Sequence, residues 1–92
     1  MSIQWLYDVI ESRKLNPSET SYTSSLFSKG LPKIAQKVGE EGTEVVVAAL
    51  SQNDQRLIEE VADLTYHTLV LLAARDLKIQ DVLAELEKRH RS

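Results

Sequence analysis

Hydrophobic residues recur at helical spacing over most of this 92-residue chain. The first apolar set is spaced three or four residues apart and consists of Ile3, Leu6, Tyr7 and Ile10. Such spacing predicts a helix over residues 3–15, which ends before Asn16-Pro17 because the residue preceding a proline disfavours helical geometry. Residues 16–25 combine a proline with many hydroxyl groups and have no sustained period, so we predict a loop there.

The same pattern predicts three further helices. Proline suits the first turn of a helix, where an amide hydrogen has no partner, and we predict a helix over about Pro32–Leu50. Asn53 or Asp54 then caps a helix that reaches about Arg75. The last segment, residues 79–90, has apolar side chains on one face and charges on the other. The chain is therefore predicted to be an all-α bundle of four main helices.

Residues 69–74 form an apolar run as long as any in the chain and are apolar on every side of their predicted helix. A helix of this kind is normally enclosed by other helices. Four short helices would struggle to enclose it, and a chain without cysteine has no disulfide to stabilise a small core. We therefore predict that residues 1–92 form a single domain, and that a homodimer completes the bundle.

Charge and composition argue against several classes of protein. A formal net charge of −3 disfavours broad electrostatic binding to nucleic acid, which needs a basic surface. The apolar run at residues 69–74 is far too short to span a bilayer, and no charged amino-terminal segment leads into an apolar stretch with a cleavage site. We expect a cytoplasmic protein that binds neither nucleic acid nor membranes.

Acidic residues lie three and four positions apart on the two central helices: Glu40, Glu41 and Glu44 on the first, and Glu59, Glu60 and Asp63 on the second. Glu41 and Glu44 are about 60° apart around a helix, as are Glu60 and Asp63. Two antiparallel helices can therefore direct both pairs toward one point. The alternative is a solvated acidic face, which is the usual explanation for a single such pair.

Two features favour a cation site over a solvated face. Like charges at this spacing destabilise a helix by roughly 0.2–0.5 kcal/mol per pair unless something neutralises them. The acids are also bracketed by apolar residues that we predict to be buried: Ile34, Val38, Val45 and Val46 on one helix, and Ile58, Val61, Leu64 and Val70 on the other. Ligands that offer only oxygen suit a hard ion, and Mg²⁺ combines carboxylates with substrate phosphates and water.

Several other polar residues near these acids have two interpretations each. Lys29, Lys33 and Lys37 could hold phosphate oxygens beside the metal, or Lys37 could form an ion pair within its own helix. The hydroxyl groups of Ser21-Tyr22-Thr23 could bind a polar ligand or lie in a plain surface connection.

Arg13, His67 and two glycines are also open to interpretation. Arg13 could bind an anion or favour the carboxyl end of its helix, and His67 could contact substrate or be a histidine of the core or an interface. Gly39 and Gly42 each cost a helix about 1 kcal/mol relative to alanine. We therefore expect another helix or a ligand to approach these glycines closely.

The residues around the acids form two long motifs, K-V-G-E-E-G-T-E-V-V-V-A-A at residues 37–49 and E-E-V-A-D-L-T-Y-H at residues 59–67. Three further segments accompany them: S-Y-T-S-S-L-F at 21–27, K-G at 29–30 and D-V-L-A-E-L-E-K-R-H at 81–90. Together these segments resemble the phosphoribosyl-ATP pyrophosphohydrolase family. The EExxE and ExxD pattern alone is shared with MazG-type and dimeric dUTPase-like enzymes.

The resemblance implies an all-α homodimer that uses Mg²⁺ to hydrolyse the α–β phosphoanhydride of 1-(5-phosphoribosyl)-ATP, the second step of L-histidine biosynthesis. It implies metal ligands at Glu41, Glu44, Glu60 and Asp63. Glu40 or Glu41 would orient or deprotonate the attacking water, and Glu40 could instead be a further ligand.

A set of polar residues is expected to bind the substrate: Arg13, Ser21, Tyr22, Thr23, Lys29, Lys33, Lys37 and His67. The alternative enzyme is a housecleaning MazG-like nucleoside triphosphate pyrophosphatase. The alternative from another class is a helical dimerisation module with an acidic stripe and no activity.

Overall fold

The computed structural model describes residues 1–90 and contains five α-helices in that range. In chain order these are α1 (Ile3–Leu15), α2 (Tyr22–Lys29), α3 (Leu31–Ser51), α4 (Asp54–Ala74) and α5 (Ile79–Arg89). Residues 1–90 contain no strand, so the all-α prediction is confirmed. The four predicted helices are α1, α3, α4 and α5, and α2 is additional.

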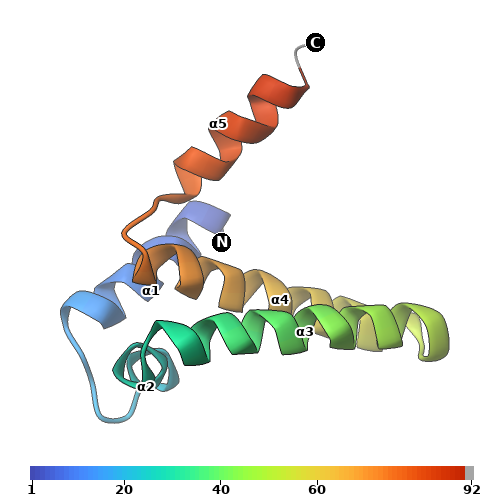
Figure 1. The fold of residues 1–92 in the computed structure, drawn as a ribbon, viewed down its shortest axis with the longest axis horizontal. Helices are drawn as coiled ribbons and strands as arrows, with labels where there is room; N and C mark the ends of the chain where they lie inside the picture. Colours follow the sequence, from blue (N-terminus) through green and yellow to red (C-terminus); the bar gives the residue numbers. More distant parts are fainter. Residues whose placement is uncertain (91–92) are drawn as a thin grey trace.

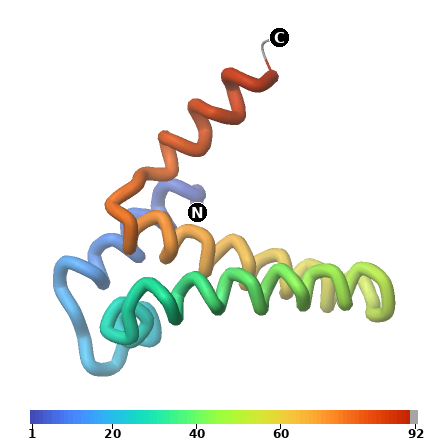
Figure 2. Tube along the Cα trace, viewed as in Figure 1, coloured from blue at the N-terminus to red at the C-terminus, as the bar shows by residue number. Residues whose placement is uncertain are grey.

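The long antiparallel hairpin of α3 and α4 is the element on which the other helices are arranged (Figures 1 and 2). Gly30 begins α3 at a φ of 92°, in the left-handed region that favours glycine, and Pro32 lies in the first turn. At the tip of the hairpin, the Asn53 side chain accepts a hydrogen bond from the amide of Arg56 at 2.9 Å and caps α4.

Helix α2 corrects the prediction of a loop over residues 16–25, which was wrong from Tyr22 onward. Its sequence, YTSSLFSK, contains four serine or threonine residues, which are weak helix formers. The helix forms because the Ser21 hydroxyl caps it by accepting from the amide of Ser24 at 3.1 Å, and because Leu26 is buried in the core. Tyr22 and Thr23 therefore lie in the first turn of a helix.

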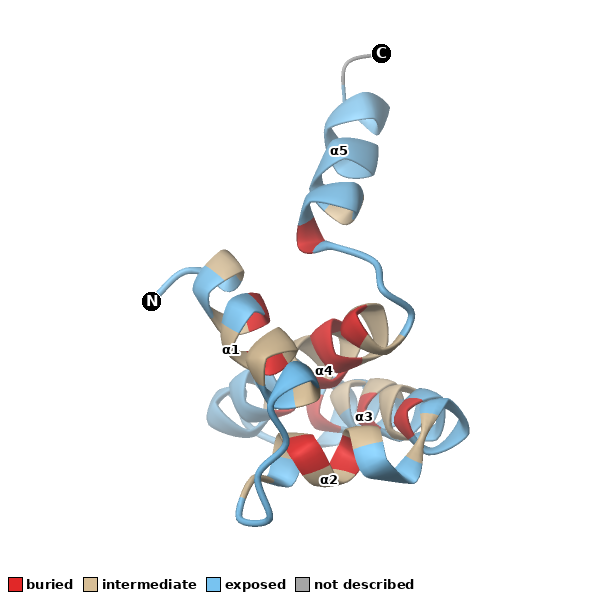
Figure 3. Ribbon diagram, turned by 90° about the vertical axis from the view of Figure 1, so that its left-hand side faces the viewer, coloured by how far each residue is buried: buried red, intermediate tan, exposed pale blue. Residues whose placement is uncertain are grey.

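The core lies where α1 and α2 pack on the half of the hairpin that contains the start of α3 and the end of α4 (Figure 3). Its buried members are Tyr7, Ile10, Leu26, Ile34, Leu69, Val70, Ala73 and Ile79. Within residues 69–74, Leu69, Val70 and Ala73 are buried and the other three are partly buried, so one chain encloses this run only in part. A hydrogen bond also connects α1 to α4, because Lys14 Nζ donates to the carbonyl of Ala73 at 2.8 Å.

The other half of the hairpin is not covered by the described chain. Its exposed apolar residues are Val46, Val47, Leu50, Ile58 and Val61. Of the residues predicted to bracket the acids, Ile34 and Val70 are buried, and Val38, Val45 and Leu64 are partly buried. The prediction was wrong for Val46, Ile58 and Val61 within one chain, because α1 and α2 do not reach that end of the hairpin.

Gly39 and Gly42 do not mark a close approach of another helix. A Cβ atom added at either position would meet no described atom within 4 Å outside its own helix backbone and its chain neighbours. No helix within residues 1–90 therefore approaches these glycines, and the alternative of a ligand stays a prediction.

Helix α5 projects away from the hairpin, as Figures 1 and 3 show. Ile79 is buried and Val82 is partly buried, whereas Leu83 and Leu86 are exposed on the same helix. The predicted amphipathic helix thus uses only its first turn for the core of its own chain. None of the helices described in residues 1–90 is both long and apolar enough to cross a membrane.

The start of α5 is held by polar contacts with α1. The buried Tyr7 hydroxyl donates to the carbonyl of Leu77 at 2.7 Å, and Lys78 forms an ion pair with Glu11. The Lys78 amine lowers the pKa of Glu11 through its hydrogen bond to the carboxylate. These contacts connect residues about seventy positions apart in the sequence and fix the origin of α5.

Replacing Tyr7 by phenylalanine tests this anchor. We expect Tyr7→Phe to lower the free energy of unfolding by about 1 kcal/mol, because the ring still fills the core while the carbonyl of Leu77 loses its donor. Urea denaturation measures the change, and amide hydrogen exchange over α5 should accelerate with it. The control is Trp5→Phe, an aromatic substitution on the exposed side of α1 that should change stability by less than about 0.5 kcal/mol. Equal stability of Tyr7→Phe and wild type would contradict the anchor.

Candidate active site

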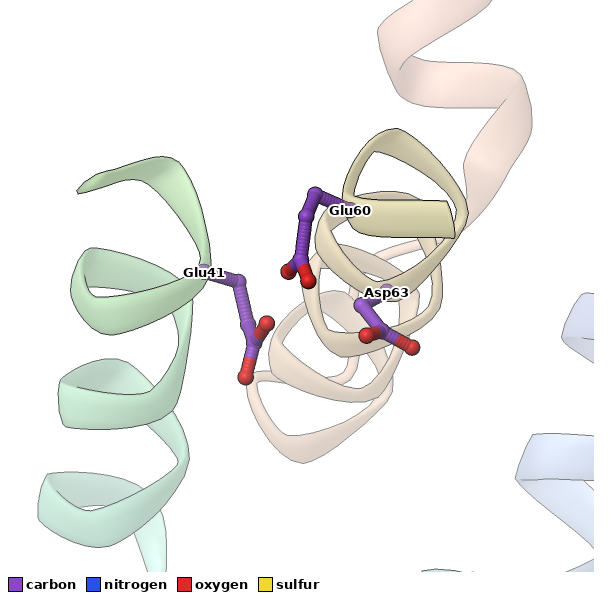
Figure 4. A group of neighbouring side chains, drawn as sticks. All are labelled: Glu41, Glu60 and Asp63. Atoms are coloured by element: carbon purple, nitrogen blue, oxygen red, sulfur yellow. The ribbon is translucent and has the colours of Figure 1, made fainter. Parts of the chain in front are cut away.

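Three carboxylates meet across the hairpin. Glu41 comes from α3, and Glu60 and Asp63 lie one turn apart on α4. Each offers an oxygen, and these oxygens all lie within 4.8 Å of one another. Figure 4 shows Glu41 reaching from its helix toward the two acids of the other. The sequence prediction that two helices bring acids to one point is confirmed for these three residues.

Two of these carboxylates are removed from water. Glu41 is 6% exposed and Glu60 is 4% exposed, and the Oε2 atom of each is buried without a hydrogen-bond partner among residues 1–90. A buried carboxylate oxygen without a partner is strongly unfavourable, because burial removes the water that would solvate its charge. A divalent cation supplies the missing interaction, and an oxygen-only donor set suits a hard ion such as Mg²⁺. The cluster is thus a group of ligands that could hold a metal.

The other oxygen of each buried glutamate is near a cation from its own helix. Lys37 Nζ lies 3.5 Å from Glu41 Oε1, and Arg56 binds Glu60 Oε1 at 2.5 Å. Partial burial opposes the charge on Lys37, but Tyr22, Glu41 and Glu40 together raise the pKa of its amine. Lys37 therefore stays positively charged beside the cluster.

Glu44 is exposed and lies against the cluster from the next turn of α3. The Glu60 carboxylate, and then that of Glu41, raise the pKa of Glu44 to about 7, because both neighbours favour the protonated form of Glu44 and repel its charge. A carboxyl group that holds its proton to neutral pH shows how much negative charge is concentrated here. Glu44 is close to the three carboxylates, although it is not one of the group whose oxygens converge.

Glu40 has a different environment from Glu41. Its carboxylate is exposed, accepts a hydrogen bond from Gln36 at 2.7 Å and lies 3.7 Å from Lys37. The bond from Gln36 lowers the pKa of Glu40, and the charges of Lys37 and Lys33 contribute in the same direction. Glu40 is therefore ionised and engaged at the surface, outside the group of converging carboxylates.

Helix α2 is fastened to α4 beside these acids. The Nδ1 atom of the buried His67 is 2.8 Å from the carbonyl of Asp63, and since a carbonyl can only accept, Nδ1 carries the hydrogen. In the neutral ring Nε2 then accepts from the Tyr22 hydroxyl, 3.3 Å away. Tyr66 completes the contact through a hydrogen bond with Thr23 and a stacked arrangement with Tyr22 at 6.3 Å between ring centres. Tyr22, Thr23 and His67 thus come together next to Asp63.

The remaining predicted site residues lie farther out. Lys29 is exposed in the last turn of α2, and Lys33 is exposed in the first turn of α3. The Ser21 hydroxyl is used to cap α2. Arg13 is exposed at the mouth of a pocket of about 510 Å³ that it shares with Lys14, Ser24 and Phe27, away from the converging carboxylates.

Arg56 is the functional candidate that sequence reasoning missed. It lines a small hollow of about 280 Å³ together with Glu44, Val47, Gln52 and Glu60. Its only sequence signal was its position four residues before Glu60, which is the spacing of an ordinary surface ion pair. The burial of Glu60, which makes this pair unusual, could not be read from spacing.

The sequence profile of a family described as phosphoribosyl-ATP pyrophosphohydrolase matches residues 3–90. Relatives named phosphoribosyl-ATP pyrophosphatase cover most of the chain. The protein of Clostridium acetobutylicum is 54% identical over 85 residues, covering 92% of this chain and 77% of the relative. The protein of Listeria welshimeri is 57% identical over 84 residues, which are 91% of this chain and 81% of the relative. The protein of Clostridium botulinum strain Hall is 51% identical over 87 residues, which are 95% of this chain and 79% of the relative.

The raised pKa of Glu44 predicts a pH effect on stability in the presence of EDTA. In the unfolded chain Glu44 returns toward its ordinary value of 4.5, so between about 4.5 and about 7 the folded state binds more protons than the unfolded state. Its contribution to stability is present below that window and is lost as pH rises through it. We expect wild type to lose stability relative to Glu44→Gln between pH 5 and pH 8, measured by urea denaturation.

The control for this measurement is Glu19→Gln, which removes an exposed carboxylate from the loop before α2. It should keep the pH response of wild type. A parallel pH response of wild type and Glu44→Gln would show that Glu44 does not hold its proton in the folded chain.

Proposed function

The chain belongs to the phosphoribosyl-ATP pyrophosphohydrolase family, and we propose that it hydrolyses 1-(5-phosphoribosyl)-ATP to 1-(5-phosphoribosyl)-AMP and pyrophosphate. This reaction is the second step of L-histidine biosynthesis. The observation that carries the assignment to this site is the pair of buried glutamate oxygens, on Glu41 and Glu60, that face across the hairpin without a partner among residues 1–90. A phosphoanhydride hydrolase needs a cation at the phosphates, and these oxygens are suited to hold one.

The proposed cofactor is Mg²⁺, with Glu41, Glu60 and Asp63 as ligands and Glu44 as a fourth. The convergence of the first three oxygens supports this set, as does the composition of the group among the described residues, which is carboxylates without histidine or cysteine. Bound magnesium neutralises charge on phosphate oxygens and makes water easier to deprotonate. Glu44 would join the set in its ionised form, since metal ligands must be deprotonated.

Glu41 is the better placed of the two glutamates proposed to orient the attacking water. Its Oε2 atom is buried in the cluster and free to accept a hydrogen bond, whereas Glu40 is exposed and already bound to Gln36. A carboxylate oriented by Lys37 on one oxygen can use the other to hold a water in position. Glu40 then acts on Lys37, whose position it helps to fix.

The polar residues on α2 and α3 are proposed to bind the phosphates and ribose of the substrate. Lys37 supports this role best, because its charged amine lies 3.5 Å from Glu41 and interacts electrostatically with Tyr22. Lys29 and Lys33 would reach outer phosphate oxygens as exposed, mobile cations. The hydroxyl groups of Ser21, Tyr22 and Thr23, with Arg13 and His67, would complete the substrate site on the α2 side.

We also propose that the chain functions as a homodimer. The exposed apolar residues at the far half of the hairpin support this, because several large apolar side chains left uncovered on one part of a protein are typical of an interface. Leu50 is the clearest example, with 83% of its surface exposed. A second copy is the simplest partner, since most soluble oligomers pair identical chains about a two-fold axis.

Removing one ligand charge tests the proposed activity. We expect Glu60→Gln to lower turnover of phosphoribosyl-ATP by more than about 100-fold, because an essential charge at the phosphates is lost while the side-chain shape is kept. Pyrophosphate release at saturating Mg²⁺ measures the effect, and circular dichroism verifies folding. The matched control is Glu59→Gln on the next position of α4, an exposed carboxylate outside the converging group, which should stay close to wild type.

The same assay separates the proposed substrate from its rivals. Wild type should act on phosphoribosyl-ATP in preference to dUTP, dCTP and ATP. Preference for one of the other nucleotides would favour the housecleaning pyrophosphatase, and near-normal activity of Glu60→Gln would remove the proposed site.

A charge on the uncovered half of the hairpin tests the dimer. We expect Leu50→Glu to convert a dimer into a monomer, because it would place a carboxylate inside an apolar interface. Analytical ultracentrifugation measures the mass in solution. Leu15→Glu is the control, since Leu15 is also an exposed leucine but lies at the end of α1. A Leu50→Glu protein with the mass of wild type would exclude this surface from the interface.

A further inference from the structure

The two buried glutamates of the cluster are held in the same way. Each is preceded by a cation four residues earlier on its own helix, Lys37 before Glu41 and Arg56 before Glu60. In both pairs the cation is near Oε1, and in both glutamates Oε2 is the buried atom without a partner among residues 1–90. The arrangement fixes one oxygen of each carboxylate and leaves the other for the cluster.

Arg56 makes the closer of these two contacts. Its two terminal nitrogens bind separate carboxylates, Glu59 Oε1 at 2.5 Å and Glu60 Oε1 at 2.5 Å. Glu59 is itself held by Gln55, whose amide donates to Oε2 at 3.2 Å. The guanidinium is therefore oriented from both sides, and its position on Glu60 is fixed by its neighbours on α4.

The charge of Arg56 affects metal binding as well as the position of Glu60. It lines the same hollow as Glu44 and Glu60, so its positive charge lies beside the oxygens that would receive a metal ion. Such a charge stabilises Glu60 when no metal is bound, because a buried carboxylate without any counter-ion is costly. It also repels a divalent cation that arrives at Oε2 of the same carboxylate.

We propose that Arg56 is the resident counter-ion of Glu60 and that it lowers the affinity of the cluster for divalent metal. Arg56 is thus a positioning residue that acts through Glu60. It keeps the carboxylate in place before the metal binds, and it makes the bound metal easier to release. The inference rests on the metal site of the proposed function.

Magnesium titration of Arg56→Gln tests this role. We expect Mg²⁺ to bind this variant about three- to tenfold more tightly than wild type, which is the range for removing a half-exposed opposing charge. Isothermal titration calorimetry with MgCl₂ alone gives the affinity. In EDTA the variant should melt at a lower temperature than wild type, and Mg²⁺ should restore more of its stability.

Controls separate charge from general damage to α4. Arg75→Gln removes the same charge from the carboxyl end of α4, far from the cluster, and should bind Mg²⁺ within about twofold of wild type. Arg56→Lys keeps the charge and should stay closer to wild type than Arg56→Gln. Arg56→Met keeps the aliphatic stem without the charge, and it provides the same test if the glutamine variant does not fold.

The possible outcomes are distinct. Tighter Mg²⁺ binding together with lower stability in EDTA supports the proposal. Unchanged or weaker binding by Arg56→Gln and Arg56→Met, with normal binding by wild type, overturns it and leaves the metal site intact. If wild type binds no Mg²⁺ at all, the metal site of the proposed function fails and this inference fails with it.

Discussion

The candidate site depends on the placement of two carboxylates, Glu41 and Glu60, where almost no water reaches them. They face each other from the two helices of the hairpin, each with one buried oxygen that has no partner among residues 1–90. An arrangement of this kind lowers stability by itself, because burying charge without compensation is unfavourable. It persists because the packing of α1 and α2 fixes the hairpin independently of the acids. Binding a cation would offset the free-energy cost of burying these carboxylates.

The fold separates the residues that provide stability from those that carry chemistry. The buried apolar cluster, with Tyr7, Ile10 and Val70 among its members, is built where α1 and α2 cover the hairpin. The acids begin where that cover ends, so Glu41 and Glu60 are enclosed while Glu44 and Asp63 remain exposed. A substrate can therefore reach the exposed edge of the cluster, and the buried edge stays fixed.

Cations and hydrogen bonds from three helices, α2, α3 and α4, surround this acidic cluster and partly offset its charge. Lys37 and Arg56 each engage a single oxygen of a buried glutamate, which reduces the net charge without filling the space between the carboxylates. Across the α2–α4 contact, Tyr22 and the ring of His67 link α2 to the backbone of Asp63. The raised pKa of Glu44 shows that charge in the cluster is still in excess after these compensations. The proposed divalent ion would neutralise this remaining negative charge.

Sequence alone determined the helices with strong period and clear ends, and it determined which acids share a face. The spacing of Glu41 with Glu44, and of Glu60 with Asp63, follows from helix geometry, so periodicity was enough to place them. Sequence similarity also supplied the family, through motifs that surround these acids. Helix α2 was beyond this kind of reasoning, because its hydroxyl-rich segment forms a helix only when the Ser21 cap and the burial of Leu26 act together.

Tertiary structure decided everything that depends on how much water each side chain retains. It buried three residues of the run 69–74 and covered the other three in part, and it left Val46, Ile58 and Val61 uncovered although their periodicity predicted a core. It also distinguished Arg56 from an ordinary surface residue. The four-residue spacing from Arg56 to Glu60 is typical of a surface ion pair, but in the packed chain Glu60 is buried. Periodicity specifies the direction of a side chain on its helix. The solvation of that side chain depends on which other helices cover it, and their positions are known only from the packed chain.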